Sequence, residues 1–194
     1  MKTLFIDTST QVLILAFIEN DKIIYREELI GKNNHSDHLI NKITEGLNKT
    51  NYQVKDFNRI IVGIGPGLYT GLRVSLTVAK TFSWTANIPL YTISSLLVIA
   101  SGYFNKPGKY IIKTHAKKGY VYATVINVLK TVDILEADAF ISSNELEVLI
   151  NKYQEAVIID EDNYMFNPLN ISNDLLTNVD DVNLVEPNYL RGEL

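Results

Sequence analysis

The 194-residue sequence contains no cysteine, and this absence excludes three classes of protein. A disulfide-stapled mini-domain, a cysteine-ligated metal site and a cysteine nucleophile all require that side chain. The longest apolar run extends only from Val12 to Ile18, far below the ~20 residues of a membrane-spanning helix. The apolar start, Thr3–Ile6, ends at Asp7 and is too short for a signal peptide. We therefore expect a cytoplasmic protein that contacts no membrane.

Charge is moderate in amount but uneven along the chain. The sequence holds 18 Lys+Arg and 22 Asp+Glu, a formal net charge of −4, and its 46% apolar content is too high for a disordered chain. Residues 1–130 carry 16 basic and 8 acidic side chains, whereas residues 131–194 carry 2 and 14. This asymmetry could steer a polyanion or a basic partner to one side, or the two parts could attract each other.

One pattern of elements occurs twice along the chain. Three β-rich runs, a helical segment and a further strand occupy about 3–64, and the same order returns at about 109–160. Lys106-Pro107-Gly108 separates the two copies. We predict an α/β fold with two lobes, 1–105 and 106–194, each built on a β-β-β-α-β unit. This duplicated topology resembles the actin, Hsp70 and sugar-kinase superfamily. The first copy's expected elements are strands at 2–7, 12–19, 22–29 and 59–64 and a helix at 36–49. The second copy's are strands at 109–114, 120–128, 131–135 and 156–160 and a helix at 142–153. Between the copies we expect a strand at 89–93 and a short helix at 94–104.

A glycine-rich loop, 65–71, follows a predicted strand and opens a predicted helix at 70–86. Free backbone N–H groups there could bind an anion, or the glycines could form a tight turn that brings strand and helix close together. The loop is no Walker A motif, because no Gly-Lys-Ser/Thr follows. It is no dinucleotide fingerprint either, because the third glycine, Gly71, falls one residue late.

The helix after this loop carries small residues four positions apart, at Gly71, Ser75 and Ala79, so they share one face. Leu72, Leu76 and Phe82 add apolar area beside them. A face of small residues lets another element approach closely. The face therefore serves either internal packing or an interface with a partner.

Four motifs, in order along the chain, resemble those of the TsaB (YeaZ) family. They are Ile6-Asp7-Thr8-Ser9, His35-Ser36-Asp37-His38-Leu39, Gly65-Pro66-Gly67-Leu68-Tyr69-Thr70-Gly71-Leu72-Arg73 and Pro187-Asn188-Tyr189-Leu190-Arg191. The resemblance implies an actin-like (ASKHA) fold and a role in making threonylcarbamoyladenosine (t6A) at position 37 of tRNAs that read ANN codons. It implies a non-catalytic subunit that supports a TsaD-type transferase, with a TsaE-type ATPase in the assembly and tRNA reached through the complex. Relative to the family, the C-terminal lobe is expected to be shortened.

Two segments depart from relatives in ways that bear on chemistry. The segment 115–120 reads His-Ala-Lys-Lys-Gly-Tyr, where members of the family often show Asp-Ala-Arg-x-Gly-Glu. The related transferase holds a metal with a His-x-x-x-His pair, and Ser95 and Ile99 stand at the matching positions. Isoleucine cannot ligate a metal. The resemblance therefore implies neither catalytic residues nor a metal site in this chain.

We expect the partner to dock on the helices at 36–49 and 70–86. Without a partner, the same apolar surface could form a homodimer. The predicted interface residues are His35, Leu39, Ile43, Tyr69, Gly71, Leu72, Ser75, Leu76, Ala79 and Phe82.

Two weaker site predictions concern nucleotides. Asp7, Thr8 and Ser9 stand where actin-like folds have their first phosphate turn, so they either contact a nucleotide or only end the strand through local hydrogen bonds. The alternative function is accordingly a nucleotide-binding or nucleotide-hydrolysing enzyme of that superfamily, and the one cofactor considered is ATP or ADP with Mg²⁺ at a joint with a partner. Lysines interleaved with tyrosines could contact RNA, namely Lys113, Lys117 and Lys118.

Overall fold

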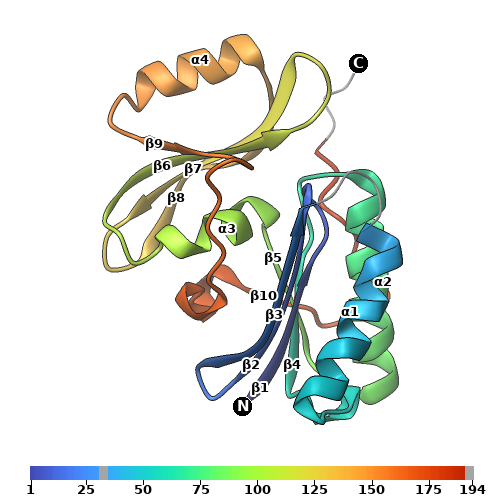
Figure 1. Ribbon diagram of the computed structural model, residues 1–194. Coiled ribbons are helices and arrows are strands. Elements are labelled where there is room, and N and C mark those ends of the chain that lie inside the picture. The colour runs from blue at the N-terminus through green and yellow to red at the C-terminus, as the bar shows by residue number, and fades with distance from the viewer. Residues whose placement is uncertain (31–34, 191–194) are drawn as a thin grey trace.

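The computed structural model describes residues 1–30 and 35–190, which form two lobes, each built on one β-sheet (Figure 1). The elements of the first lobe are β1 (Lys2–Asp7), β2 (Val12–Glu19), β3 (Lys22–Ile30), α1 (His35–Thr50), η1 (Val54–Asp56), β4 (Arg59–Gly63), α2 (Tyr69–Ala86) and β5 (Leu90–Ile93). They are followed by α3 (Ser95–Ala100), η2 (Ser101–Tyr103), β6 (Gly108–His115), β7 (Tyr120–Val128), β8 (Val132–Ser142), α4 (Ser143–Lys152) and β9 (Val157–Ile159). The last elements are η3 (Pro168–Asn170), η4 (Asn173–Leu175) and β10 (Thr177–Asn178).

The two sheets repeat one topology. In the first sheet the strand order is β10-β5-β4-β1-β2-β3, and in the second it is β8-β7-β6-β9. In each, three antiparallel strands lead through a helix to a strand that lies parallel to the first of them, β4 beside β1 and β9 beside β6. This confirms the predicted duplication of a β-β-β-α-β unit.

Alternation along β1 explains how the first sheet is covered on both faces. Successive side chains of a strand point to opposite faces, and Leu4 and Ile6 pack in one core while Phe5 packs in the other. The core with Leu4 and Ile6 lies under α1 and α2, and the core with Phe5 includes α3 and the second sheet. Figure 1 shows this arrangement, with α1 and α2 on the side of the sheet that faces away from the second lobe.

The turn between β2 and β3 has the conformation that the sequence predicts. Asn20 and Asp21 both have positive φ, 48° and 60°. A two-residue hairpin turn of type I′ requires this conformation at both positions, and Asn and Asp tolerate it best after glycine.

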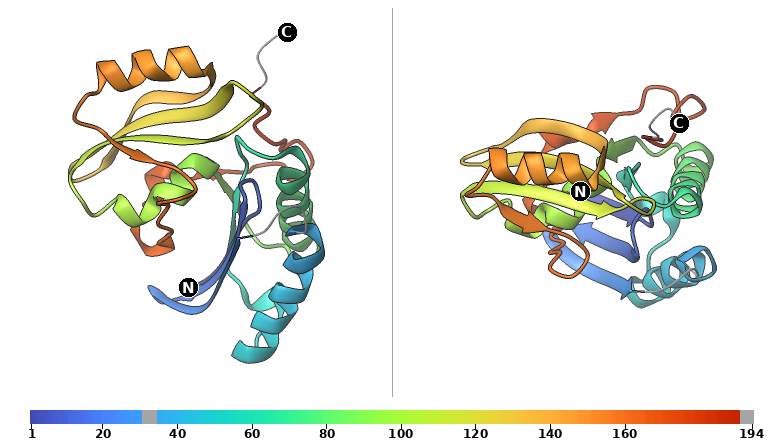
Figure 2. Two further views of the ribbon diagram at one scale, coloured as in Figure 1. Left: turned by 45° about the horizontal axis from the view of Figure 1, so that its top comes forward. Right: turned by 90° about the horizontal axis from the view of Figure 1, so that it is seen from above.

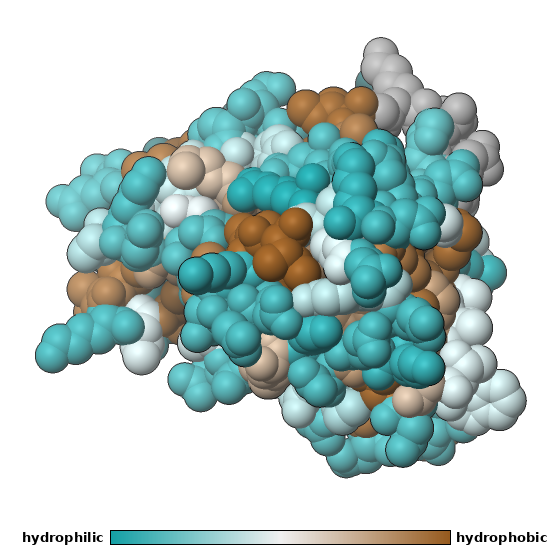
Figure 3. All heavy atoms as spheres, turned by 60° about the horizontal axis from the view of Figure 1, so that its bottom comes forward, coloured by the Kyte–Doolittle hydropathy of each residue, from teal (hydrophilic) through white to brown (hydrophobic). Residues whose placement is uncertain are grey.

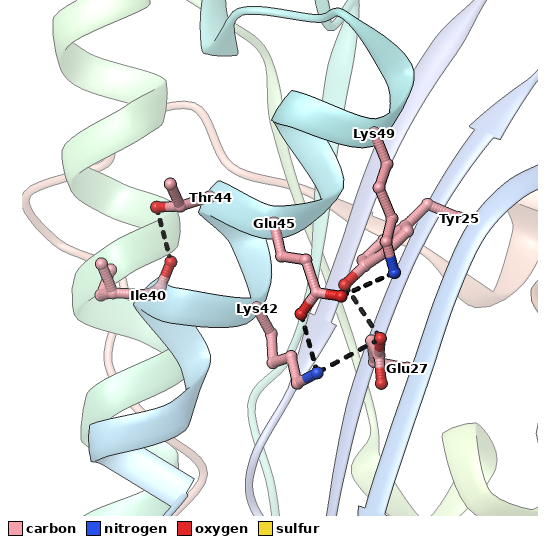
Figure 4. A network of polar contacts seen from close by, with 7 residues as sticks. All are labelled: Tyr25, Glu27, Ile40, Lys42, Thr44, Glu45 and Lys49. Carbon is pink, nitrogen blue, oxygen red and sulfur yellow. Dashed lines mark hydrogen bonds and ion pairs between the residues drawn. The ribbon is translucent and has the colours of Figure 1, made fainter.

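A network of charged side chains attaches α1 to β3 (Figure 4). The Lys42 ammonium lies 2.8 Å from a Glu45 carboxylate oxygen and 3.5 Å from one of Glu27 on β3. The Lys49 ammonium lies 2.6 Å from the other Glu45 oxygen. Hydrogen bonds from these two lysines lower the pKa of Glu45 to about 2.

The end of the chain returns to the first lobe and adds a strand to its sheet. The Phe166 ring lies 5.1 Å from that of Phe5 between ring centroids, and β10 extends the first sheet by pairing with β5. The predicted division assigned all of 106–194 to the second lobe, and this assignment is wrong for the segment from about residue 164 onward. The open edge of β5 and the apolar surface around Phe5 offer the tail a place to bury its side chains. Figure 2 shows the tail running back along the first lobe.

Two further boundaries differ from the predictions. The strand expected at 131–135 continues to Ser142, because β7 provides it with a partner along its whole length. The helix expected at 94–104 is divided into α3 and the 3₁₀ turn η2. On the face shown in Figure 3, hydrophilic side chains dominate and the apolar ones form separate patches.

Candidate functional site

The glycine loop lies directly on the turn that follows β1. A Cβ atom added at Gly67 would stand 2.2 Å from the Ser9 carbonyl oxygen, and one added at Gly71 would stand 1.8 Å from that of Thr8. The Leu68 N–H donates a hydrogen bond to the Ser9 carbonyl oxygen over 2.6 Å. Of the two interpretations of this loop, close approach of strand and helix is therefore the one that the geometry supports.

The candidate phosphate turn, Asp7-Thr8-Ser9, is enclosed by this loop. All three residues are buried. One Asp7 carboxylate oxygen accepts a hydrogen bond from the Ser9 N–H over 2.7 Å, and Thr8 Oγ1 donates to the Gly71 carbonyl oxygen over 2.6 Å. Burial raises the pKa of Asp7, and hydrogen bonds with Ser9 and Ser95 offset this only in part. In this conformation no surface is left for a phosphate, so the prediction of nucleotide contact at these residues is not supported.

The small-residue face of α2 serves the interior of the lobe. Ser75 and Ala79 are fully buried, and Ser75 Oγ donates to the Gly71 carbonyl oxygen over 3.3 Å. The prediction of partner contact is therefore wrong for the residues that this lobe itself covers, which are Leu39, Ile43, Gly71, Leu72, Ser75, Leu76 and Ala79. Of the other predicted contacts, Tyr69 is 44% exposed and Phe82 is half-buried. The side chain of His35 lies outside the described residues.

The opposite face of α2 is the one that reaches the surface. Tyr69, Arg73 and Thr77 follow one another at intervals of four residues and are exposed, and together with Val74 and Val78 they line a shallow apolar groove along the helix. Nearer the end of α2, the Trp84 side chain is 74% exposed. The same four-residue spacing is visible in the sequence, but spacing alone does not indicate which face of the helix is exposed.

A pocket of about 340 Å³ opens between the two lobes. Three segments meet around it, namely the β6–β7 turn of the second lobe, the start of α2 and the last segment of the chain. Figure 1 shows the backbone of these segments. Its walls come from the glycine loop (67–69 and Leu72), the β6–β7 turn (115–117), strands β7 and β8 (Tyr122 and Phe140) and the tail (188–189). No sequence pattern indicated that Phe140 and Tyr189 belong to one site, because 49 positions separate them.

Each side of this pocket carries aromatic rings with a cation beside them. On the first lobe, the Tyr69 and Tyr189 rings lie 5.4 Å apart, the Arg73 guanidinium lies 4.1 Å from the centre of the Tyr69 ring, and Arg73 Nε donates to Tyr189 Oη over 2.9 Å. On the second lobe, the Lys117 ammonium lies 5.6 Å from the centre of the Phe140 ring. Cations over aromatic faces are attracted by the ring quadrupole.

The three lysines of the RNA prediction occupy unlike environments. The Lys113 ammonium forms an ion pair with Asp160 over 2.8 Å and is half-buried, so its charge is already compensated. Lys117 and Lys118 are exposed. Of the three lysines, only Lys117 and Lys118 therefore present an uncompensated positive charge at the rim of the pocket or next to it.

The positions matched to the transferase's metal ligands serve packing in this chain. Ser95 Oγ accepts a hydrogen bond from the Gly65 N–H over 2.9 Å, and Ile99 lies in the core between the lobes. Among the side chains that the structure describes, those of residues 1–30 and 38–190, no three acidic or histidine groups gather in a way that could hold a metal ion.

A family model described as TsaD, tRNA N6-adenosine threonylcarbamoyltransferase, matches residues 29–179. The chain belongs to this family. Among curated relatives, the TsaB protein of Bacillus subtilis (strain 168) is 34% identical to this chain over 122 residues, and that of Escherichia coli (strain K12) is 27% identical over 124. Both are named tRNA threonylcarbamoyladenosine biosynthesis proteins. These matches confirm the resemblance to TsaB.

The matches cover the chains unevenly. Each of the two curated relatives aligns with 63% of this chain and 53% of its own length, so the chain spans about half the length of the relatives that it matches. Among solved structures, YeaZ from Pseudomonas aeruginosa superposes with a TM-score of 0.67 at 18% identity, over 73% of this chain and 67% of its own. A structure described as an uncharacterized protein with similarity to peptidase YEAZ from Pseudomonas aeruginosa reaches 0.78 at 15% identity, over 98% and 99%. These superpositions confirm the predicted actin-like fold.

Within the residues that the structure describes, no helix is both long enough and apolar enough to cross a bilayer.

Proposed function

We propose that this chain is a non-catalytic subunit in the formation of t6A at position 37 of tRNAs that read ANN codons. Similarity to proteins named for the biosynthesis of this nucleoside carries the proposal. The non-catalytic role is supported by Ser95 and Ile99, which are buried at the positions where the related transferase holds its metal. The alternative, a nucleotide-hydrolysing enzyme, has less support because the turn Asp7–Ser9 is closed.

The proposed partner is a TsaD-type transferase, and we place its docking surface on the outward face of α1 and α2. This outward surface carries Ile40, Tyr69, Thr77 and Trp84, all of them exposed. The groove between Tyr69 and Val78 is mostly apolar, and an apolar groove gains free energy when a partner removes it from water. A second copy of the chain would cover the same surface when the transferase is absent.

The remaining parts of the assembly follow from the same proposal. A TsaE-type ATPase joins the complex and tRNA is reached through it; the chain holds no cofactor of its own in this proposal, and the one place considered for ATP or ADP with Mg²⁺ is a joint with a partner. In this proposal the formation of t6A takes place in the cytoplasm.

Light scattering behind size exclusion tests the docking surface, with this chain alone and mixed with the TsaD-type protein of the same organism. We expect a stoichiometric complex that Thr77→Arg abolishes, because the new charge is placed in the groove. Thr131→Arg, at an exposed turn of the second lobe, is the matched control and should leave the complex intact. Elution of the two proteins as separate species, with and without ATP and Mg²⁺, contradicts the proposal.

A further inference from the structure

The pocket between the lobes combines two properties that together specify a class of ligand. Aromatic side chains reach it from both lobes, Tyr69 and Tyr189 on one and Tyr122 and Phe140 on the other. Of the described residues that line it, none is acidic, whereas His115 and Lys117 both belong to the lining. A planar group would stack on the rings, and an anion would be attracted to the rim.

The size of the pocket limits the ligand to a small unit. A volume of about 340 Å³ lies at the lower end of the range of roughly 300–1,000 Å³ found for small-molecule sites. One nucleotide fits this description, because its base is planar and its phosphate is anionic. A base paired within a duplex could not enter, since its faces are covered by its neighbours in the stack.

We propose that this pocket holds one unstacked nucleotide of a single-stranded RNA segment, with its base among the aromatic rings and its phosphate at Lys117. The inference deepens the proposed function and rests on it for the choice of RNA as the source of the nucleotide. Lys118 is exposed next to Lys117 and attracts the adjoining phosphate. Lys113 takes no part, because Asp160 neutralises it.

The test measures binding of a short single-stranded oligoribonucleotide that contains 2-aminopurine, whose fluorescence falls when its base stacks. The full chain is titrated at low salt, and binding should quench the probe. Tyr122→Ala should weaken binding about 5-fold to 150-fold, the range expected for one base–aromatic stack, whereas Tyr122→Phe should retain the affinity. Tyr153→Ala, a half-buried tyrosine at the end of α4, is the matched control.

Two further variants test the pocket and the Lys117 charge, and show whether a loss of binding is caused by unfolding instead. Ala116→Phe fills the pocket and keeps every aromatic ring and charge that lines it, so it should abolish quenching while the melting temperature stays near that of the parent protein. Lys117→Ala should reduce the slope of log affinity against log salt by about 0.7, as loss of one phosphate contact on single-stranded RNA predicts. Lys130→Ala, at an exposed turn, should leave that slope unchanged.

Three outcomes would overturn the inference. They are absence of binding, affinity that neither Tyr122→Ala nor Ala116→Phe changes, and equal binding of a duplex of the same sequence. Competition by AMP at the concentration of the oligonucleotide would assign the pocket to a free nucleotide and remove RNA from the proposal. Docking of the transferase is tested separately through Thr77, which does not line the pocket, so a complex that still forms by light scattering and is abolished by Thr77→Arg would show that only the pocket assignment had failed.

Discussion

Gly71 stands in direct contact with the backbone of Thr8. The Thr8 hydroxyl donates to the Gly71 carbonyl oxygen over 2.6 Å, and a Cβ atom at residue 71 would lie 1.8 Å from the Thr8 carbonyl oxygen. The start of α2 is therefore pressed against the end of β1. This contact closes the turn where actin-like folds have their first phosphate loop.

Replacing Gly71 with alanine should destabilise the protein by about 1–3 kcal/mol or more, because the helix must move away from Thr8 to make room. In an exposed helix interior the same change would stabilise by up to ~1 kcal/mol, so the sign of the effect is the test. Unfolding in urea measures it. Thr77→Ala, on the exposed side of α2, should change the free energy of unfolding by less than about 0.5 kcal/mol. A Gly71→Ala protein as stable as its parent would show that the contact is relaxed in solution.

Asp7→Asn should flatten the decline in stability above pH 4. Burial raises the pKa of Asp7, so over the interval between its unfolded value of about 3.9 and its folded value the folded state binds more protons. Stability contributed by this group is therefore full below pH 4 and falls as the pH rises through the folded pKa. Melting temperatures from pH 4 to 8 measure the effect, with Asp174→Asn at an exposed position as the control. Parallel curves for parent and Asp7→Asn would contradict it.

Glu45→Gln should reduce the loss of stability at acid pH, whereas Asp7→Asn reduces the loss of stability above pH 4. The pKa of Glu45 is lowered to about 2 by Lys42 and Lys49, so its contribution is present above its unfolded value of about 4.3 and is lost as the pH falls toward 2. Between pH 5 and 2 the variant should lose less of its free energy of unfolding than the parent protein loses. The difference between the two should be small because the network is exposed to solvent. Acid titration followed by circular dichroism detects it. Glu147→Gln, an exposed helix position on α4, should leave the acid transition as it is in the parent.

Phe166→Ala should detach the tail from the first lobe. The ring is 3% exposed and packs beside Phe5, and loss of a buried phenylalanine costs about 3–5 kcal/mol. Limited proteolysis should then cut after residue 164 at lower protease concentration, and thermal unfolding should begin earlier. Leu169→Ala, whose side chain is 44% exposed, is the control for the same segment. Equal protease resistance of the two variants would mean that the tail is held mainly by β10.

Local patterns were sufficient for most of the fold. Short apolar, β-rich runs predicted β1 and β2 to the residue, and Asn20-Asp21 predicted the hairpin turn between β2 and β3. The order of elements predicted the duplicated sheets. These features depend on side chains that are close in sequence, and the period of a strand or helix is imposed by its own backbone.

The sequence by itself determined most of the strands and helices, and that two like units exist. Only the tertiary structure decided which face of α2 is buried, because both the small residues at Gly71 and Ser75 and the larger ones at Arg73 and Thr77 recur at helical spacing. It also decided where the tail lies, since the two-residue strand β10 is too short to leave a periodic signal. The pocket between the lobes is the extreme case. Its walls come from segments far apart along the chain, and no rule of local spacing relates residues that meet only after both lobes have folded and the tail has returned.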